Sequence, residues 1–295
     1  METIPSILIN RIGALGDVIL ITPIVRKIYF DHGGKCQITV RTHWTNVFQN
    51  NPYVHTLINE KEPLDISKFD KIINLDLVYE KNPRMHIVDA YGTFAFGHNL
   101  FDRRSELHPS KKDEELAFRF KDQIGGSYIT LHMRNTHQEN RNIPKYFWNN
   151  LIIEILNFTS LPIVQIGTKS DFAFGGNDKL LDMREKFNLQ ELREVIDKSD
   201  LYIGVDSAPL HIAATTRTEI IAFFTTARGE YRKPLRAIEN FTEIKPEIDC
   251  YGCQVNLPLG STMAICQRKD NDCVNQFDFE KTLNLIKSKI TSLRS

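Results

Sequence analysis

The chain has 295 residues, in which 37 lysines and arginines balance 37 aspartates and glutamates. Hydrophobic residues make up 41% and charged residues 25%, so the chain has enough apolar surface to fold, which excludes disorder over most of its length. The formal net charge of zero gives no reason to expect a nucleic acid as partner. For the same reason we expect at most peripheral contact with a membrane.

Two further classes of protein are disfavoured by the sequence. No apolar run approaches the ~18 residues that a membrane-spanning helix needs. The first apolar stretch is interrupted at Arg11 and Asp17, which is not typical of a secretory signal. The five cysteines are an odd number, so with no export signal we expect a reducing, cytoplasmic location.

The first third of the chain alternates between predicted strands and helices. An apolar run at residues 6–10 predicts a buried strand, and a glycine-bearing turn follows it. Apolar residues then recur at helical spacing, with Pro23 restarting the helix after a cap at Thr22. We expect further strands and one short helix, in chain order: a strand at 37–41, the helix around 44–50, and strands at 54–58 and 71–77. This alternation predicts a parallel sheet covered by helices.

After a polar stretch from residue 99 to residue 126, the same alternation restarts. Strands are predicted at 127–133, 162–167, 200–205 and 219–224, and helices at 145–156, at 189–198 and from Ala208. Two such units predict an α/β protein with two doubly wound, Rossmann-like domains that face each other across a cleft. We assign residues 1–120 to the first domain, 121–276 to the second with a cysteine-rich loop at 250–273, and 277–295 to a C-terminal helix.

The turn after the first strand, which runs Gly13-Ala-Leu-Gly16-Asp17, lies where open α/β sheets bind ligands. Its glycines allow a close backbone approach, and Asp17 stands at the start of a helix facing the cleft. An aspartate is also favoured there simply by the helix dipole. The turn lacks the G-x-G-x-x-G pattern, which disfavours a nicotinamide dehydrogenase.

The stretch from Asp206 to His211 follows the predicted strand at 200–205 and opens a helix. Its order, Asp206-Ser-Ala-Pro-Leu-His211, places backbone N–H groups at a helix start, where a phosphate can bind. A plain capped helix is the alternative. Arg134 and Arg141 follow the strand at 127–133, and a guanidinium suits phosphate because it donates two parallel hydrogen bonds. Both arginines could also be solvated loop residues.

Taken in order, these segments resemble glycosyltransferase family 9, the ADP-heptose heptosyltransferases. The matching residues are 11–23, the segment with Arg141, Pro144 and Trp148, and the stretch 206–214. The resemblance implies the GT-B fold, in which the C-terminal helix crosses back to the first domain. The chain differs from the family pattern at Arg141, Ile143 and Ala208, where the family usually has lysine, an aromatic residue and glycine.

The resemblance also implies roles for single residues. Asp17 corresponds to the catalytic base of an inverting transfer that needs no metal, and Arg141 to a residue that meets the donor diphosphate. The remaining residues implied in donor binding are Gly16, Asp206, Ser207, Ala208 and His211. The donor would be a nucleotide sugar such as ADP-heptose, and the acceptor a glycan such as lipopolysaccharide core, a lipid-linked glycan or a protein. A sugar-nucleotide epimerase and a non-catalytic sugar-nucleotide-binding module are the alternatives.

Four cysteines gather near the C-terminus, at positions 250, 253, 266 and 273. Four thiolates can hold a metal ion tetrahedrally, and the pair Cys250-x-x-Cys253 is a common start of such a site. We predict a structural metal ion bound by Cys250, Cys253, Cys266 and Cys273, with Zn²⁺ ahead of iron; disulfides or unlinked thiols are the alternatives. Beyond them, an apolar stripe at helical spacing between residues 279 and 293 predicts an amphipathic helix.

Overall fold

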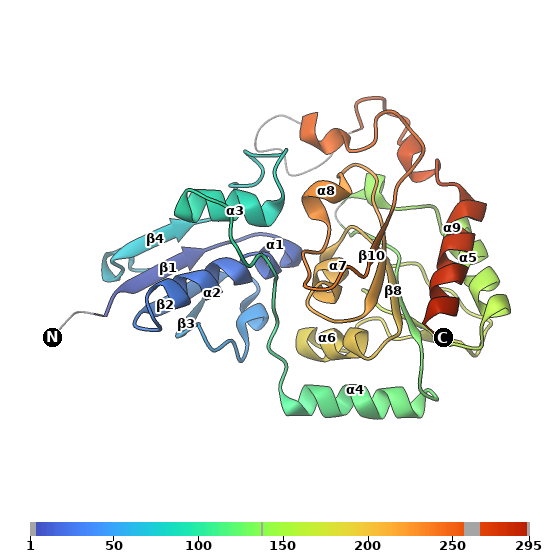
Figure 1. The fold of residues 1–295 in the computed structure, drawn as a ribbon, viewed down its shortest axis with the longest axis horizontal. Helices are drawn as coiled ribbons and strands as arrows, with labels where there is room; N and C mark the ends of the chain where they lie inside the picture. Colours follow the sequence, from blue (N-terminus) through green and yellow to red (C-terminus); the bar gives the residue numbers. More distant parts are fainter. Residues whose placement is uncertain (1–3, 137, 257–265, 294–295) are drawn as a thin grey trace.

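The computed structural model describes residues 4–136, 138–256 and 266–293. These residues form two parallel sheets, each covered by helices and lying side by side along the longest axis of the molecule (Figure 1). The predicted α/β architecture of two doubly wound domains is therefore confirmed. None of the helices in the described ranges is long and apolar enough to cross a membrane.

The first sheet has the strand order β3-β2-β1-β4, with all strands parallel. Its strands are β1 (Ser6–Asn10), β2 (Gln37–Thr42), β3 (Thr56–Asn59) and β4 (Lys71–Asn74). Its helices are α1 (Leu15–Ile19), α2 (Thr22–Asp31) and α3 (Ile87–Phe96), and 3₁₀ turns lie at Thr45–Phe48 and Ile66–Lys68. Pro23 does restart the helix, but the cap is Ile21 and not the predicted Thr22, whose hydroxyl donates to the carbonyl of Ile19.

The second sheet has the order β10-β9-β8-β5-β6-β7 and is also parallel. Its strands are β5 (Ile129–His132), β6 (Ile163–Gln165), β7 (Leu180–Asp182), β8 (Leu201–Val205), β9 (Glu219–Phe223) and β10 (Phe241–Ile244). Its helices are α5 (Lys145–Phe158), α6 (Leu189–Asp197), α7 (Ala208–Ala213) and α8 (Gly229–Arg232), with 3₁₀ turns at Glu139–Arg141, Cys253–Asn256 and Asp272–Val274. The sequence pattern predicted neither β7 nor β10, which are short and lie at the two edges of the sheet.

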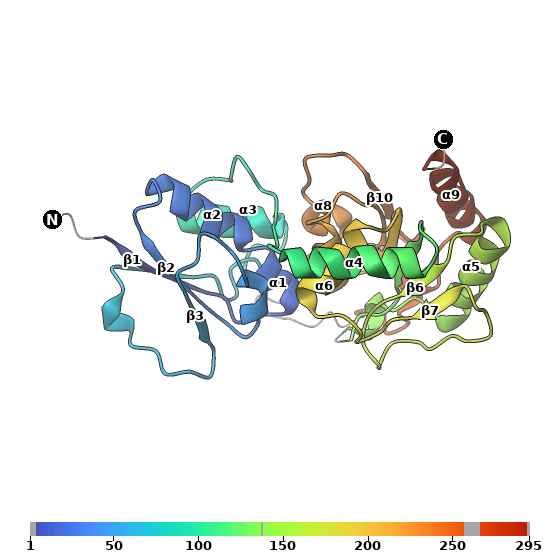
Figure 2. The same cartoon turned by 90° about the horizontal axis from the view of Figure 1, so that it is seen from below.

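Helix α4 (Lys111–Gln123) corrects the predicted boundary between the domains. It begins at a capping box, in which Ser110 and Asp113 bond each other's backbone N–H groups. The helix packs along α6, beneath the second sheet (Figure 2). The boundary predicted between residues 120 and 121 falls inside this helix; the crossing is the extended stretch before Lys111. Polarity of the segment predicted a linker, but the buried Ala117 and Phe120 anchor it to the second domain.

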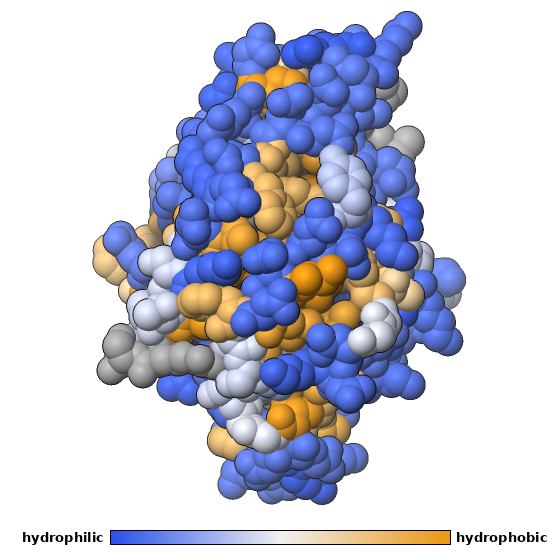
Figure 3. All heavy atoms as spheres, turned by 90° about the vertical axis from the view of Figure 1, so that its right-hand side faces the viewer, coloured by the Kyte–Doolittle hydropathy of each residue, from blue (hydrophilic) through white to orange (hydrophobic). Residues whose placement is uncertain are grey.

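Helix α9 (Phe279–Ser292) corrects a second prediction, because it does not cross to the first domain. It packs on α5, and its buried Leu283, Ile286 and Ile290 belong to the hydrophobic core of the second domain. Lys289 adds an ion pair to Glu219 at the start of β9. Hydrophobic side chains still reach the surface on this side of the molecule (Figure 3), among them Ile153 and Phe158 of α5. The amphipathic stripe was therefore interpreted correctly as a packing face, but assigned to the wrong domain.

Candidate active site

The loop after β1 and the turn after β8 meet between the two domains. Helix α1 packs against α7, and Gly16 lies at this contact. A Cβ atom built on Gly16 would lie 2.6 Å from His211 Cδ2 and 3.6 Å from Ala208 Cα. Only glycine therefore fits at this position without displacing His211. Gly16, Ala208 and His211, which the sequence predicted as parts of one donor site, are brought together.

Asp17 stands one residue further, in the first turn of α1, and its side chain is 16% exposed. Its Oδ2 atom lies 2.8 Å from Arg11 Nη2 and accepts a hydrogen bond from the Tyr79 hydroxyl at 3.5 Å. Both of these contacts go to the same carboxylate oxygen. Asp17 is therefore held in one orientation by groups of its own domain, at the edge that faces α7.

Arg11 organises this part of the cleft, and the sequence analysis gave it no role. It is 2% exposed and lies within 4 Å of three carboxylates: Asp17 at 2.8 Å, Glu80 at 3.0 Å and Asp76 at 3.7 Å. Its guanidinium also lies 5.3 Å from the ring centroid of Tyr79. Burial opposes the charge of Arg11, but Tyr91, Asp17 and Glu80 raise its pKa above the ordinary value. The signal in the sequence is a cation placed directly after a buried strand.

Arg141 and Asp206, both predicted as donor-binding residues, form an ion pair in the second domain. The distance from Arg141 Nη1 to Asp206 Oδ2 is 2.9 Å, and both side chains are largely buried. Arg141 Nη2 donates to Gln254 at 2.9 Å, and Asn135 donates to the backbone carbonyl of Asp206 at 3.1 Å. Arg141 therefore fastens the loop after β5 to the turn after β8, and its charge is balanced by Asp206.

Ser207, the next predicted residue, contacts His132, which in turn lies close to Asp171. Its hydroxyl lies 3.0 Å from Nδ1 of His132, and His132 Nε2 lies 3.6 Å from Asp171 Oδ2. Burial lowers the pKa of His132 to about 4, so its ring favours the neutral form, and burial also raises the pKa of Asp171. Neither His132 nor Asp171 was among the site residues predicted from the sequence.

His211 lies where the charged groups of both domains converge. It is 5% exposed, and its Nδ1 atom has no hydrogen-bond partner among the described residues. Burial lowers its pKa, while the charges of Asp206 and Asp17 raise it and those of Arg232 and Arg141 lower it. An unpaired ring nitrogen this deep in the cleft is suited to contact a polar ligand.

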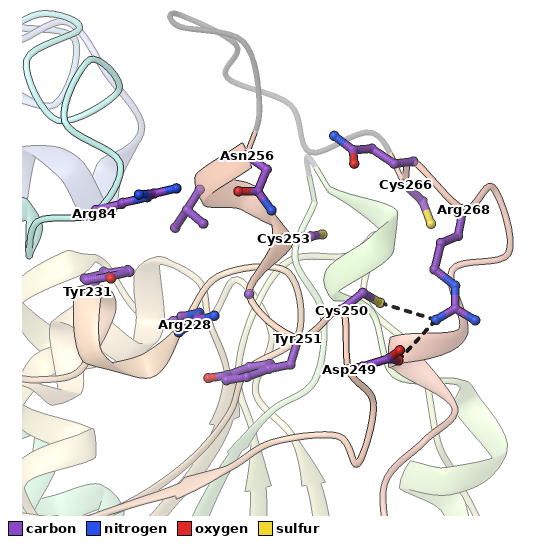
Figure 4. Close-up of a pocket in the computed structure, with 13 residues that line it drawn as sticks. Arg84, Arg228, Tyr231, Asp249, Cys250, Tyr251, Cys253, Asn256, Cys266 and Arg268 are labelled. Carbon is purple, nitrogen blue, oxygen red and sulfur yellow. Dashed lines mark hydrogen bonds and ion pairs between the residues drawn. The ribbon is translucent and has the colours of Figure 1, made fainter.

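A pocket of about 430 Å³ lies at the edge of the cleft, where Arg84 of the first domain stands opposite Tyr231 of α8 (Figure 4). Arg228 and Tyr251 line it from the second domain, together with the loop that carries the cysteines. Arg228 is paired with Glu230 at 3.6 Å. The remaining lining residues are Asp249, Cys250, Gly252, Cys253, Val255, Asn256, Cys266, Gln267 and Arg268.

Comparison with known proteins decides which family these features belong to. The profile of glycosyltransferase family 9 (heptosyltransferase) matches residues 109–260, just over half of the chain. The chain belongs to glycosyltransferase family 9. It is accordingly an enzyme of the glycosyltransferase class. Among curated protein sequences, none matches the chain.

Solved structures of this family have the same fold over nearly the whole chain. A family 9 glycosyltransferase from Veillonella parvula has a TM-score of 0.74 at 15% identity and covers 99% of both chains. ADP-heptose lipopolysaccharide heptosyltransferase II from E. coli has a TM-score of 0.71 at 11% identity, over 98% of this chain and 100% of its own. The iron-containing dodecameric glycosyltransferase TibC from enterotoxigenic E. coli gives 0.75 at 14%, over 99% and 78%. The predicted GT-B architecture therefore agrees with these structures.

The sequence predicts that the four cysteines near the C-terminus bind a metal ion. Within the described residues, no group of three or more His, Cys, Asp or Glu side chains could hold one. Arg268 Nη1 contacts the sulfur of Cys250 at 3.9 Å, and the buried Cys273 faces the carbonyl of Asn140. The structure thus does not support the predicted zinc or iron site at Cys250, Cys253, Cys266 and Cys273.

Two departures from the family pattern can be located in the structure. Ile143, where the resemblance implies an aromatic residue, is fully buried in the core of the second domain. Ala208, where the resemblance implies a glycine, lies at the contact with Gly16. The departure at Ile143 therefore lies in the hydrophobic core, whereas the departure at Ala208 lies in the candidate site.

Proposed function

We propose that this family 9 enzyme transfers a heptose from ADP-heptose to a hydroxyl group of a glycan such as lipopolysaccharide core, with inversion at the anomeric carbon. The observation that carries the proposal is the contact between the Asp17 loop and the turn that begins at Asp206, which brings a carboxylate of one domain to the donor turn of the other. TibC, one of the similar structures, was solved with ADP-D-beta-D-heptose, which supports this donor. A lipid-linked glycan or a protein is the other class of acceptor, and the reaction would take place in the cytoplasm.

In this mechanism Asp17 is the general base. Its Oδ2 is occupied by Arg11 and Tyr79, so Oδ1 is the oxygen that takes the proton from the acceptor hydroxyl. The deprotonated oxygen attacks the anomeric carbon as the bond to the diphosphate breaks. The departing ADP gathers negative charge, and Arg141, Ser207 and the backbone N–H groups that follow Ser207 stabilise it without a metal ion.

The experiment that tests the proposal compares Asp17→Asn with Glu80→Gln. Both variants remove a carboxylate that contacts Arg11, but only the first removes the proposed base. We expect Asp17→Asn to lower transfer by about 10²–10⁴-fold, the range for removal of a general base, while ADP binding persists. Glu80→Gln should keep most of the transfer activity. NMR of the product should show the inverted anomer.

Two results would refute the proposal. Full turnover by Asp17→Asn would remove Asp17 from the mechanism. If the unaltered protein binds ADP-heptose but neither transfers nor hydrolyses the sugar with any acceptor class, it is a sugar-nucleotide-binding module. The family match favours transfer over epimerisation, and an epimerase would convert the free donor without any acceptor.

A further inference from the structure

Arg232, the last residue of α8, is a buried arginine at the interface between the two domains. It is 6% exposed, and its guanidinium lies 4.9 Å from the ring centroid of Tyr79 in the first domain. The Tyr79 hydroxyl is the group that contacts Asp17. His86 holds α8 in this position, because its Nε2 donates to the carbonyl of Lys233 at 3.0 Å while its Nδ1 accepts from Val88 N. Arg232 and the proposed base Asp17 therefore contact the same side chain, Tyr79.

The charge of Arg232 is not balanced by the protein. Across the described ranges, no carboxylate oxygen lies within 4 Å of its guanidinium; its one hydrogen bond goes to the backbone carbonyl of Tyr231 at 3.1 Å. The other two buried arginines of the cleft differ in this respect. Arg11 is surrounded by carboxylates, and Arg141 is paired with Asp206. A buried cation is costly unless an anion accompanies it, so this position is built for an anion that the protein does not supply.

The position of Arg232 indicates which anion this is. The Tyr79 ring that Arg232 covers carries the hydroxyl that contacts Asp17. His211 is packed against Gly16 beside Asp17. In the proposed transfer, the acceptor oxygen at Asp17 attacks the same anomeric carbon that the donor diphosphate leaves. The diphosphate must therefore lie within a few ångströms of Asp17 and His211. Arg141 cannot neutralise the diphosphate alone, because Asp206 already balances its charge.

We infer that Arg232 binds the diphosphate of the nucleotide sugar and stabilises it as the leaving group, through the planar fork of its guanidinium. This inference rests on the proposed function, but it concerns a residue to which neither the motifs nor the family resemblance assigns a role. It also explains why α8 is tied to the first domain: the tie holds the cation over Tyr79, at the point where the charge of the departing group develops.

The test uses Arg232→Met, which keeps the length and the packing on Tyr79 but removes the charge, with ADP and inorganic pyrophosphate as probes. Arg217→Met is the control, since Arg217 is an exposed arginine of the second domain that lies 3.7 Å from Asp197 and outside the candidate site. We expect Arg232→Met to weaken ADP and pyrophosphate binding about tenfold or more in calorimetry. The melting temperature without ligand should not fall, because no counter-charge is lost. Arg217→Met should bind both probes like the unaltered protein.

Unchanged ADP affinity in folded Arg232→Met would overturn the inference. If the ligand-free melting temperature falls as well, Arg232 is a structural clamp. If Arg232→Met does not fold, Arg232→Gln replaces it and is judged by the same criterion. Because the readout is ADP binding, it is independent of the transfer assay on Asp17→Asn. Loss of transfer without loss of ADP binding concerns the proposed function, and loss of ADP binding concerns Arg232.

Discussion

In the first domain one buried arginine, Arg11, is surrounded by three carboxylates, whereas in the second domain Arg141 has a single carboxylate partner. Arg232 has none within the part of the chain that the structure describes. One wall of the cleft therefore carries surplus negative charge and the other surplus positive charge. This difference suits a reaction in which a proton is removed on one side and a diphosphate departs on the other.

Replacing Arg11 is expected to have the largest effect, because it removes the only cation described among the three carboxylates of the first wall. Replacement by methionine would leave Asp17, Glu80 and Asp76 close together without their cation. We expect a loss of about 3 kcal/mol in the free energy of unfolding, because removing one partner of a buried ion pair leaves uncompensated charge. Urea unfolding measures this loss, and Arg11→Lys should recover part of it. A neutral effect of Arg11→Met would show that the carboxylates do not depend on this residue.

Mild acid is expected to destabilise both domains, because each domain holds a buried neutral histidine. Burial lowers the pKa of His86 in the first domain to about 3 and that of His132 in the second to about 4. An unfolded chain binds these protons near pH 6.5, so stability is complete above that pH and falls as the pH drops from about 6.5 toward 4. The slope should reach about 1.4 kcal/mol per pH unit for each histidine.

Urea unfolding between about pH 7 and pH 5 tests this, since most carboxylates stay ionised over that range. His132→Gln should remove one histidine's share of the slope and leave the share of His86. An unchanged slope in His132→Gln would mean that His132 is already protonated in the folded protein. A similar loss with His86→Gln would show that the two domains respond to acid alike.

The contact between the two walls is tested by Gly16→Ala. The added Cβ would lie 2.6 Å from His211 Cδ2, so the side chain or the domains must move. We expect a destabilisation of about 1–3 kcal/mol, typical of overpacking in a closed contact. The double variant Gly16→Ala/His211→Ala should recover most of that loss in thermal unfolding. If it recovers none, the strain lies with Ala208 or the backbone.

The smallest effect is expected at the chain of side chains under the donor turn. Ser207→Ala and His132→Phe each remove one partner of the same hydrogen bond, worth about 1 kcal/mol. In a double-mutant cycle on ADP affinity, the two effects should therefore not add. Full additivity would show that His132 does not act on the donor site through Ser207.

Local patterns were sufficient for much of the fold. Apolar runs bounded by glycine and proline predicted the central strands of both sheets, because parallel strands buried on both faces need continuous apolar sequence. The edge strands β7 and β10 were missed, since they are short and only partly buried. The stripe of α9 predicted a buried face, but a stripe does not say which domain covers it.

The sequence by itself determined that Asp17 and the turn from Asp206 to His211 stand at the carboxyl ends of parallel strands, since strand, turn and helix follow from neighbouring residues. Only the tertiary structure decided what surrounds them. The three carboxylates of Arg11 come from residues as far as 69 positions away, and the partner of Arg141 lies 65 positions along the chain. The charge balance of each wall depends on such distant pairs, and no local pattern records whether a basic residue such as Arg232 finds a partner.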